Sequence, residues 1–278
     1  MTTAVRLLGL GAAFAQEPPP FPLIQDLPSR YNLTGNEVID VLGVELGQPR
    51  TEAQTALQVA YPDYTLRPDT SVIGVKDARA NEVSFSYYAG DNIGGVSKDK
   101  VRDTMNVYYS TPINGERVTG ISRIVSYPDT AEADLNGLLA ALDAKYGKPS
   151  YVQPFGLPGV RLYYIWYEGA RVTISEEQWA AESKSYFPDP SPVGCRDMAG
   201  FIGGFSFSPP RKDEFPGCTA SLVVEIGFGR RNDLVRDVRM EMIDWRRVYD
   251  AGEATNRFIQ EAFDKATSAG GGAAAPAL

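Results

Sequence analysis

The chain contains no histidine among its 278 residues. Histidine is the commonest general base and transition-metal ligand in proteins, so Ser-His-Asp sites, Cys-His sites and histidine-bound zinc are excluded. Acid–base chemistry would have to rest on Asp, Glu, Lys or Tyr. No stretch approaches the roughly 20 apolar residues that cross a bilayer, so we expect no membrane span. The sequence also carries no metal or cofactor motif, and we expect neither kind of ligand.

Positive charge is in deficit, because 27 Lys and Arg residues face 35 Asp and Glu residues. The net charge is −8 and the sequence pI is about 4.8. Nucleic acid requires a basic surface on its partner, so we do not expect nucleic-acid binding. The apolar content of 43% is ordinary for a globular protein, and the length suffices for one large domain or two small ones.

Cysteine is also scarce, with only Cys195 and Cys218 present. The pair would form a disulfide in an oxidising compartment and would remain two thiols in the cytosol. Residues 1–15 bear on this choice, because Arg6 precedes a short apolar stretch and an A-x-A cleavage motif ends at Ala15. We interpret them as a signal peptide, with an untidy N-terminal tail as the alternative. We therefore predict a periplasmic or secreted bacterial protein with the disulfide formed.

The clearest helix lies between Pro128 and Pro149. Asp129 stands at an N-cap position with Glu132 three residues later, and Gly147 is placed to end the helix. One apolar stripe follows at helical spacing: Leu135, Leu138, Leu139 and Leu142. A second helix is expected between Pro49 and Pro62, with Ala53, Ala56, Leu57 and Ala60 on its apolar face.

Segments in the two halves of the chain resemble one another. SFSYYAG, ending at Gly90, matches LYYIWYEG, ending at Gly169, and ERVTGISRIV from Glu116 resembles DLVRDVRMEM from Asp233. Their common order indicates a tandem repeat, with chance alternation of ordinary elements as the alternative. We therefore predict an α+β fold made of two tandem units, each a helix packed on antiparallel sheet, followed by a C-terminal helix that docks on one of the units.

The predicted boundaries follow from this repeat. Residues 30–127 form the first unit, and residues 128–245 form the second, which carries the disulfide in an insertion. The remaining segments are a signal peptide (1–15), a proline-rich lead-in (16–29), a C-terminal helix (246–269) and a disordered tail (270–278).

The run DVLGVELGQPRTEAQTAL, which starts at Asp40, resembles the opening of two kinds of small periplasmic protein. These are the beta-lactamase inhibitor proteins and the small lipoprotein of the outer-membrane assembly machine. The likeness is carried by Gly43, Leu46, Gly47 and Ala53. It implies short helical units packed on antiparallel sheet, and it implies binding rather than catalysis. No contact motif of either family maps onto this chain, so no residue role is carried over.

Aromatic residues gather in the predicted strands, where alternation should bury about half of them. Tyr88 shares a strand face with Ser84 and Ser86, while Tyr163 and Tyr167 share one with Arg161. Polar neighbours suggest exposure, so we predict a binding face formed by Tyr88, Tyr163, Tyr167 and Arg161. The alternative is a face covered by the N-terminal segment or the C-terminal helix.

These observations favour a non-catalytic exported protein that binds another protein or an envelope component through an aromatic sheet face. A carboxylate-dependent, glycosidase-like hydrolase and a purely structural envelope component are the alternatives. A glycosidase requires two carboxylates that face one cleft. The carboxylates near the cysteines are Glu176, Glu177, Asp189, Asp213 and Glu214. We read the two adjacent glutamates as strand residues pointing to opposite faces, which disfavours catalysis.

Overall fold

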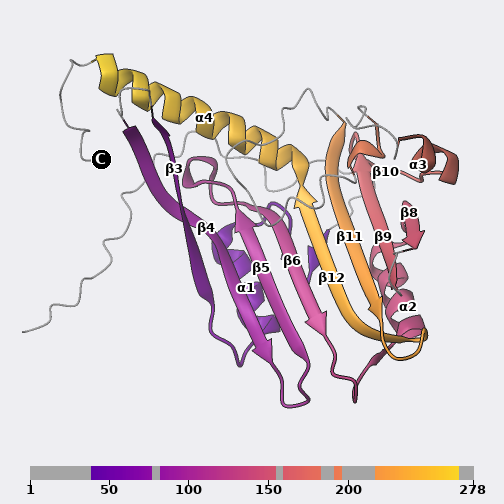
Figure 1. Cartoon of the computed structure of the whole chain (residues 1–278). Helices are drawn as coiled ribbons and strands as arrows, with labels where there is room; N and C mark the ends of the chain where they lie inside the picture. The colour runs from indigo at the N-terminus through magenta and orange to yellow at the C-terminus, as the bar shows by residue number, and fades with distance from the viewer. Residues whose placement is uncertain (1–38, 77–81, 155–158, 183–190, 196–216, 269–278) are drawn as a thin grey trace, which may run out of the picture.

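The computed structural model describes residues 39–76, 82–154, 159–182, 191–195 and 217–268, and within them the chain has an α+β fold (Figure 1). The predicted signal peptide (1–15), lead-in (16–29) and tail (270–278) lie outside the described residues, as does the start of the first predicted unit.

One antiparallel sheet of ten strands organises the chain, in the order β10-β9-β11-β12-β6-β5-β4-β3, with β7 beside β12 and β8 beside β9. The strands are β3 (Arg67–Lys76), β4 (Glu82–Val96), β5 (Arg102–Tyr109), β6 (Val118–Ser126), β7 (Ala133–Asp134), β8 (Tyr151–Pro154), β9 (Gly159–Tyr167), β10 (Ala170–Arg171), β11 (Cys218–Phe228) and β12 (Leu234–Asp244). A small hairpin of β1 (Asp40–Val41) and β2 (Val44–Glu45) precedes it. The antiparallel α+β class is as predicted, and pairing of β6 with β12 makes the strands of both halves one sheet.

Two helices, α1 (Arg50–Ala60) and α2 (Leu135–Tyr146), cover one side of this sheet, behind the strands in Figure 1. We call this side the helix face. Their apolar stripes pack on the inward side chains of the strands, and the main core contains Ala53, Leu57, Leu142, Met105, Ile121, Leu222 and Met242. The expected stripes are confirmed, since Leu135, Leu138 and Leu139 also pack against this core.

The helix α2 begins later than its sequence suggested. Asp134, not Asp129, is the N-cap, and its carboxylate accepts a hydrogen bond from the Gly137 N–H at 2.5 Å. Residues 133 and 134 pair with β12 as strand β7, so the helix cannot start before them. Asp129 instead pairs with Arg230, at 2.6 Å. The helix ends at Gly147 as predicted, with a positive φ of 71°.

The long C-terminal helix α4 (Trp245–Ser268) crosses the other side of the sheet, in front of the strands in Figure 1. Its Ile259 is buried with Ile73, Phe85 and Tyr87 of β3 and β4. At its beginning, Trp245 is buried with Ile243 and Val223, residues of β12 and β11. The helix was predicted to dock on one unit, but it packs against strands from both halves of the chain. No helix in the described part of the chain is long and apolar enough to cross a membrane.

The disulfide between Cys195 and Cys218 is formed, with 5.8 Å between the Cα atoms, as predicted. The bond joins Cys195 to the first residue of β11. Trp179 of the short helix α3 (Glu176–Glu182) belongs to the same cluster of buried side chains as the two cysteines, and its ring stacks on Tyr151 at 3.9 Å between centroids. A 3-10 turn, η1 (Pro112–Asn114), and Gly115 after it connect β5 to β6.

Candidate binding face

Residues that alternate with the helix-face core point to the opposite side of the sheet, which we call the polar face. The strand register aligns its side chains in rows that run across the sheet. One row consists of Asn92, Asn106, Ser122, Glu241, Val223 and Tyr163, taken from β4, β5, β6, β12, β11 and β9. The next row consists of Gly94, Thr104, Ile124, Arg239, Glu225 and Arg161. The polar face therefore continues through strands from both halves of the chain.

Four charged side chains stand together where β9, β11 and β12 cross these rows. Arg161 forms an ion pair with Glu225, and Arg239 forms one with Glu241. Arg239 and Glu225 are also direct cross-strand neighbours, so the two pairs adjoin. Burial raises the pKa of the Glu241 carboxyl above its ordinary value, and Arg239 opposes this increase. The cluster is electrically balanced, with two positive and two negative groups.

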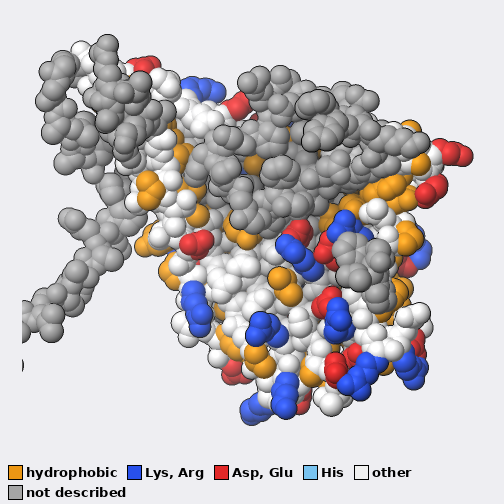
Figure 2. Space-filling model, viewed as in Figure 1, with side chains coloured by type: hydrophobic (Ala, Val, Ile, Leu, Met, Phe, Trp, Pro, Cys, Tyr) orange, Lys and Arg blue, Asp and Glu red, His pale blue; other side chains and the backbone are white. Residues whose placement is uncertain are grey.

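Small and amide side chains occupy the neighbouring strands. The Asn92 side chain donates to that of Asn106 at 2.5 Å, and Ser122 continues the row toward Glu241. In Figure 2 the lower part of this face is mostly white, the colour of the backbone and of side chains that are neither apolar nor charged, with scattered blue, red and orange groups.

Tyr108 is the aromatic side chain of β5 on the polar face, next to Gly90 and Gly120 of the neighbouring strands. Burial and the carboxylates of Glu241 and Asp69 raise its pKa, while Arg239 lowers it. These influences place the phenol among the charged groups of the face.

Arg161 and Tyr163, two of the four predicted binding residues, lie on the polar face together. The Arg161 guanidinium donates to the Tyr163 hydroxyl at 3.2 Å, and that hydroxyl donates to Gln153 at 3.0 Å. However, Tyr163 is only 4% exposed, because the Trp179 ring packs on it at 4.7 Å. The expected exposure of Tyr163 is therefore wrong.

Tyr167, the third predicted residue, lies at the end of β9 and is partly buried against the cluster around the disulfide. It is the cross-strand partner of Cys218. Its ring occupies the space beside Gly217, where an added Cβ would come within 2.0 Å of a ring carbon. Tyr167 thus packs on the chain next to the disulfide.

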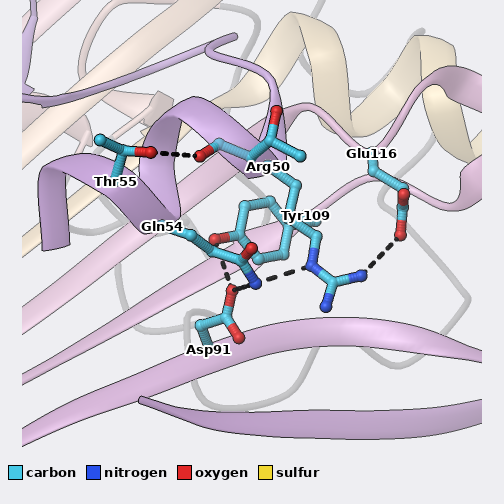
Figure 3. A network of polar contacts seen from close by, with 7 residues as sticks. Arg50, Gln54, Thr55, Asp91, Tyr109 and Glu116 are labelled. Carbon is cyan, nitrogen blue, oxygen red and sulfur yellow. Dashed lines mark hydrogen bonds and ion pairs between the residues drawn. The ribbon is translucent and has the colours of Figure 1, made fainter. Parts of the chain in front are cut away.

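Tyr88, the fourth predicted residue, lies on the helix face, so it does not share a surface with the other three. The guanidinium of Arg50, from α1, stacks over its ring at 4.1 Å. Arg50 begins a buried polar network shown in Figure 3, which joins α1 to β4 and β5.

Asp91 is the centre of that network and is only 2% exposed. One of its carboxylate oxygens accepts from the Tyr109 hydroxyl at 2.8 Å and from the Gln54 amide at 2.9 Å, and Arg50 lies 3.9 Å away (Figure 3). Burial and this carboxylate raise the pKa of Tyr109, so the phenol keeps its proton and donates. Arg50 also pairs with Glu116 at 3.0 Å. Such an arrangement fixes α1 on the sheet.

Two of the carboxylates considered for a hydrolase, which were expected on a strand, lie on a helix. Glu176 and Glu177 lie in the first turn of α3 and not on a strand, and both are exposed. The Tyr151 hydroxyl donates to Glu176 at 2.7 Å. Asp189, Asp213 and Glu214 lie outside the described residues.

Sequence reasoning did not select Tyr108, Glu225, Arg239 or Glu241. Their alternation with Val107, Val224, Met240 and Met242 was a readable signal, since those apolar residues are all in the main core. The pairing that brings the strands together was not readable, because it depends on the register between distant strands.

Comparisons of the chain with protein-family models, with curated proteins and with solved structures each gave no match. We therefore infer the function from the geometry of the polar face.

Proposed function

We propose that this is an exported, non-catalytic protein that binds another protein or an envelope component through the polar face. The observation that carries the proposal is the continuity of the face. Rows that hold many hydrogen-bonding and charged side chains, interrupted by Gly94, Ile124 and Val223, run from β4 to β9, and the main core lies on the other side of the same strands. In this proposal Arg161 keeps its predicted role in binding, and the buried Tyr163 holds it in place by accepting a hydrogen bond from its guanidinium.

The proposal includes two tandem units, over residues 30–127 and 128–245. Its support is the order of elements, because α1 precedes β3 to β6 and α2 precedes β8 to β12, with β6 and β12 adjacent. In this arrangement each unit contributes half of the polar face. An experimental structure whose two halves fail to superpose would overturn this part.

A photo-crosslinking residue placed on each face tests the binding function. We would introduce it at Thr104 or Ser126 on the polar face, and at the exposed Glu52 of α1 as the matched control. With envelope extract, we expect adducts from the first two positions and none from the third. Equal labelling from all three positions, or none from any, would reject the polar face as the binding surface.

A carboxylate-dependent hydrolase is the second candidate, favoured by one observation. Glu225 and Glu241 share the polar face, and burial raises the pKa of Glu241, as a general acid requires. Each carboxylate, however, forms an ion pair with an arginine, and for Glu241 that arginine opposes the increase in pKa. Turnover of a polysaccharide that disappears in Glu241→Gln would favour the hydrolase over the binding protein.

A further inference from the structure

The two edges of the large sheet are built differently. At one edge, β9 carries β8, which has four residues and ends in Pro154, and β10, which has two residues. Short strands and proline are devices that keep a sheet edge from pairing with another chain. At the other edge lies β3, whose ten residues pair with β4 and with no other described strand (Figure 1). The second edge is therefore long enough to accept a further strand.

We propose that β3 pairs antiparallel with β3 of a second copy of this chain, which joins the sheets of the two copies. The inference goes beyond the proposed function, because it concerns the sheet edge and not the polar face.

The backbone of β3 is regular and accessible. Its register with β4 runs without interruption from Thr70 to Lys76. In antiparallel pairing a strand directs its N–H and C=O groups alternately to its two sides, so β3 presents groups on the side away from β4. Pro68, which has no N–H, stands at the second position and leaves the rest of the strand able to donate. Residues 67–70, Val72 and Gly74 are exposed, so this edge is open to a partner strand.

Val72 favours a second copy as the partner. Its side chain is 62% exposed, and its cross-strand neighbour on β4, Ser86, is exposed as well. A twofold axis perpendicular to the sheet at Val72 places this side chain directly opposite Val72 of the second copy. On the same side of the sheet, Thr70 then lies opposite Gly74 of the second copy. Apolar β-branched side chains that face each other across antiparallel strands stabilise the pairing, and here they remove an exposed valine of each copy from water.

The charges of β3 do not oppose this register. No charged residue occurs between Asp69 and Lys76. With about 3.4 Å per residue, the Asp69 positions of the two copies are about 20 Å apart, and those of Arg67 are farther apart. Both separations exceed the Debye length of about 8 Å at physiological ionic strength, so repulsion between like charges is screened. Because the opposite edge is short, pairing through β3 uses the one long edge of the described sheet and closes at a dimer.

Size-exclusion chromatography with light scattering, over a series of concentrations of the full-length protein, tests the inference. We expect a mass twice that of one chain at the higher concentrations. Val72→Lys should weaken the dimer about tenfold or more, because it places two positive charges opposite each other. The matched control is Val59→Lys, at a valine of α1 that is 77% exposed, and it should leave the dimer unchanged. Thermal unfolding checks that each variant is folded, and Val72→Thr replaces Val72→Lys if that variant is not.

A cysteine at the twofold axis tests the register. Cys195 and Cys218 are bonded to each other, so a thiol introduced by Val72→Cys has no cysteine partner in its own chain. Residues directly opposite in antiparallel strands have Cα atoms about 4.5–5.5 Å apart, within the range of a disulfide. Under oxidising conditions we expect Val72→Cys to form a covalent dimer and Val59→Cys to form none.

A dimer that Val72→Lys weakens and Val72→Cys traps supports the inference. A protein that is monomeric at every concentration would overturn it and leave the edge to a strand of another protein. A dimer that Val72→Lys leaves intact, or that Val59→Lys weakens equally, also contradicts it. The crosslinks from Thr104 and Ser126 test the polar face separately, so the inference and the proposed function fail independently.

Discussion

The helix face and the polar face use the same strands but hold their polar groups differently. On the helix face, Asp91 is fully enclosed and receives hydrogen bonds from Tyr109 and Gln54. On the polar face, Arg239 and Glu225 remain partly exposed, with side chains 51% and 33% accessible. Enclosed groups contribute to stability because their removal leaves buried partners unsatisfied, whereas accessible groups remain available to a ligand.

Enclosed and accessible groups also occur side by side on the polar face itself. Near β9 and the start of α4, Tyr163, Ile243 and Trp245 form a second core together with Trp179. Farther along the same rows, Asn106 and Thr104 are partly exposed. The predictions below test this boundary, from the largest expected effect to the smallest.

Replacing Tyr163 should have the largest effect, because this ring belongs to the second core. We expect Tyr163→Ala to lower the free energy of unfolding by about 4 kcal/mol, through lost packing against Trp179 and the cavity left behind. Tyr163→Phe keeps the ring and should cost about 1 kcal/mol for the lost hydroxyl contacts with Gln153 and Arg161. Urea unfolding measures both. A loss below about 1 kcal/mol in Tyr163→Ala would restore the exposed surface that its sequence neighbours suggest.

Removal of the Asp91 carboxylate tests the helix face. We expect Asp91→Ala to destabilise the protein by about 3 kcal/mol, since Tyr109, Gln54 and Arg50 would lose a buried partner. The matched control is Glu116→Ala, which removes the other carboxylate paired with Arg50 at a side chain that is 33% exposed. It should cost less than about 1 kcal/mol. Equal costs in denaturant unfolding would show that enclosure does not distinguish the two partners of Arg50.

Asp244, buried where β12 meets α4, gives a dependence on pH. Its carboxylate accepts from the Arg247 N–H at 2.9 Å and from the Arg247 guanidinium at 3.1 Å, yet burial raises its pKa from 3.8 to about 6. The folded state therefore binds the proton more tightly than the unfolded state. The stability from this group is fully present below pH 4 and is lost as the pH rises through about 6, a change of about 3 kcal/mol.

The measurement compares unfolding free energies between pH 4 and 7. We expect Asp244→Asn, which cannot titrate, to lack this decline, while the exposed Asp264→Asn on the same helix should keep it. A decline that persists unchanged in Asp244→Asn would assign it to other groups, such as Glu241.

Local patterns predicted much of the framework of the fold. The leucine stripe from Leu135 to Leu142 and the helix end at Gly147 were readable, because each depends on neighbours a few residues apart. The start of α2 was missed since Asp134 pairs with β12 about a hundred residues later in the chain. The cysteine pairing was readable because the chain offers only one pair.

The candidate site was harder to predict from the sequence, and two tyrosines show the physical reason. Alternation along a strand predicts which neighbours share a face with Tyr88 and with Tyr163, but it does not predict which distant residues pack over that face. Trp179 covers Tyr163 from a separate helix, and Arg50 covers Tyr88 from α1. Polar strand neighbours indicate exposure only when no distant element packs over the same face.

Substitutions in the charged rows should have the smallest effect on stability. Glu225→Gln removes the charged partner of Arg161, and water can compensate in part because the two side chains are 33% and 27% accessible. We expect this variant to change the free energy of unfolding by about 0.5 kcal/mol, the usual range for exposed ion pairs. A loss above about 2 kcal/mol in urea unfolding would show that this pair is structural. The rows would then belong with Asp91, and the difference between the two faces, on which the proposed binding surface depends, would disappear.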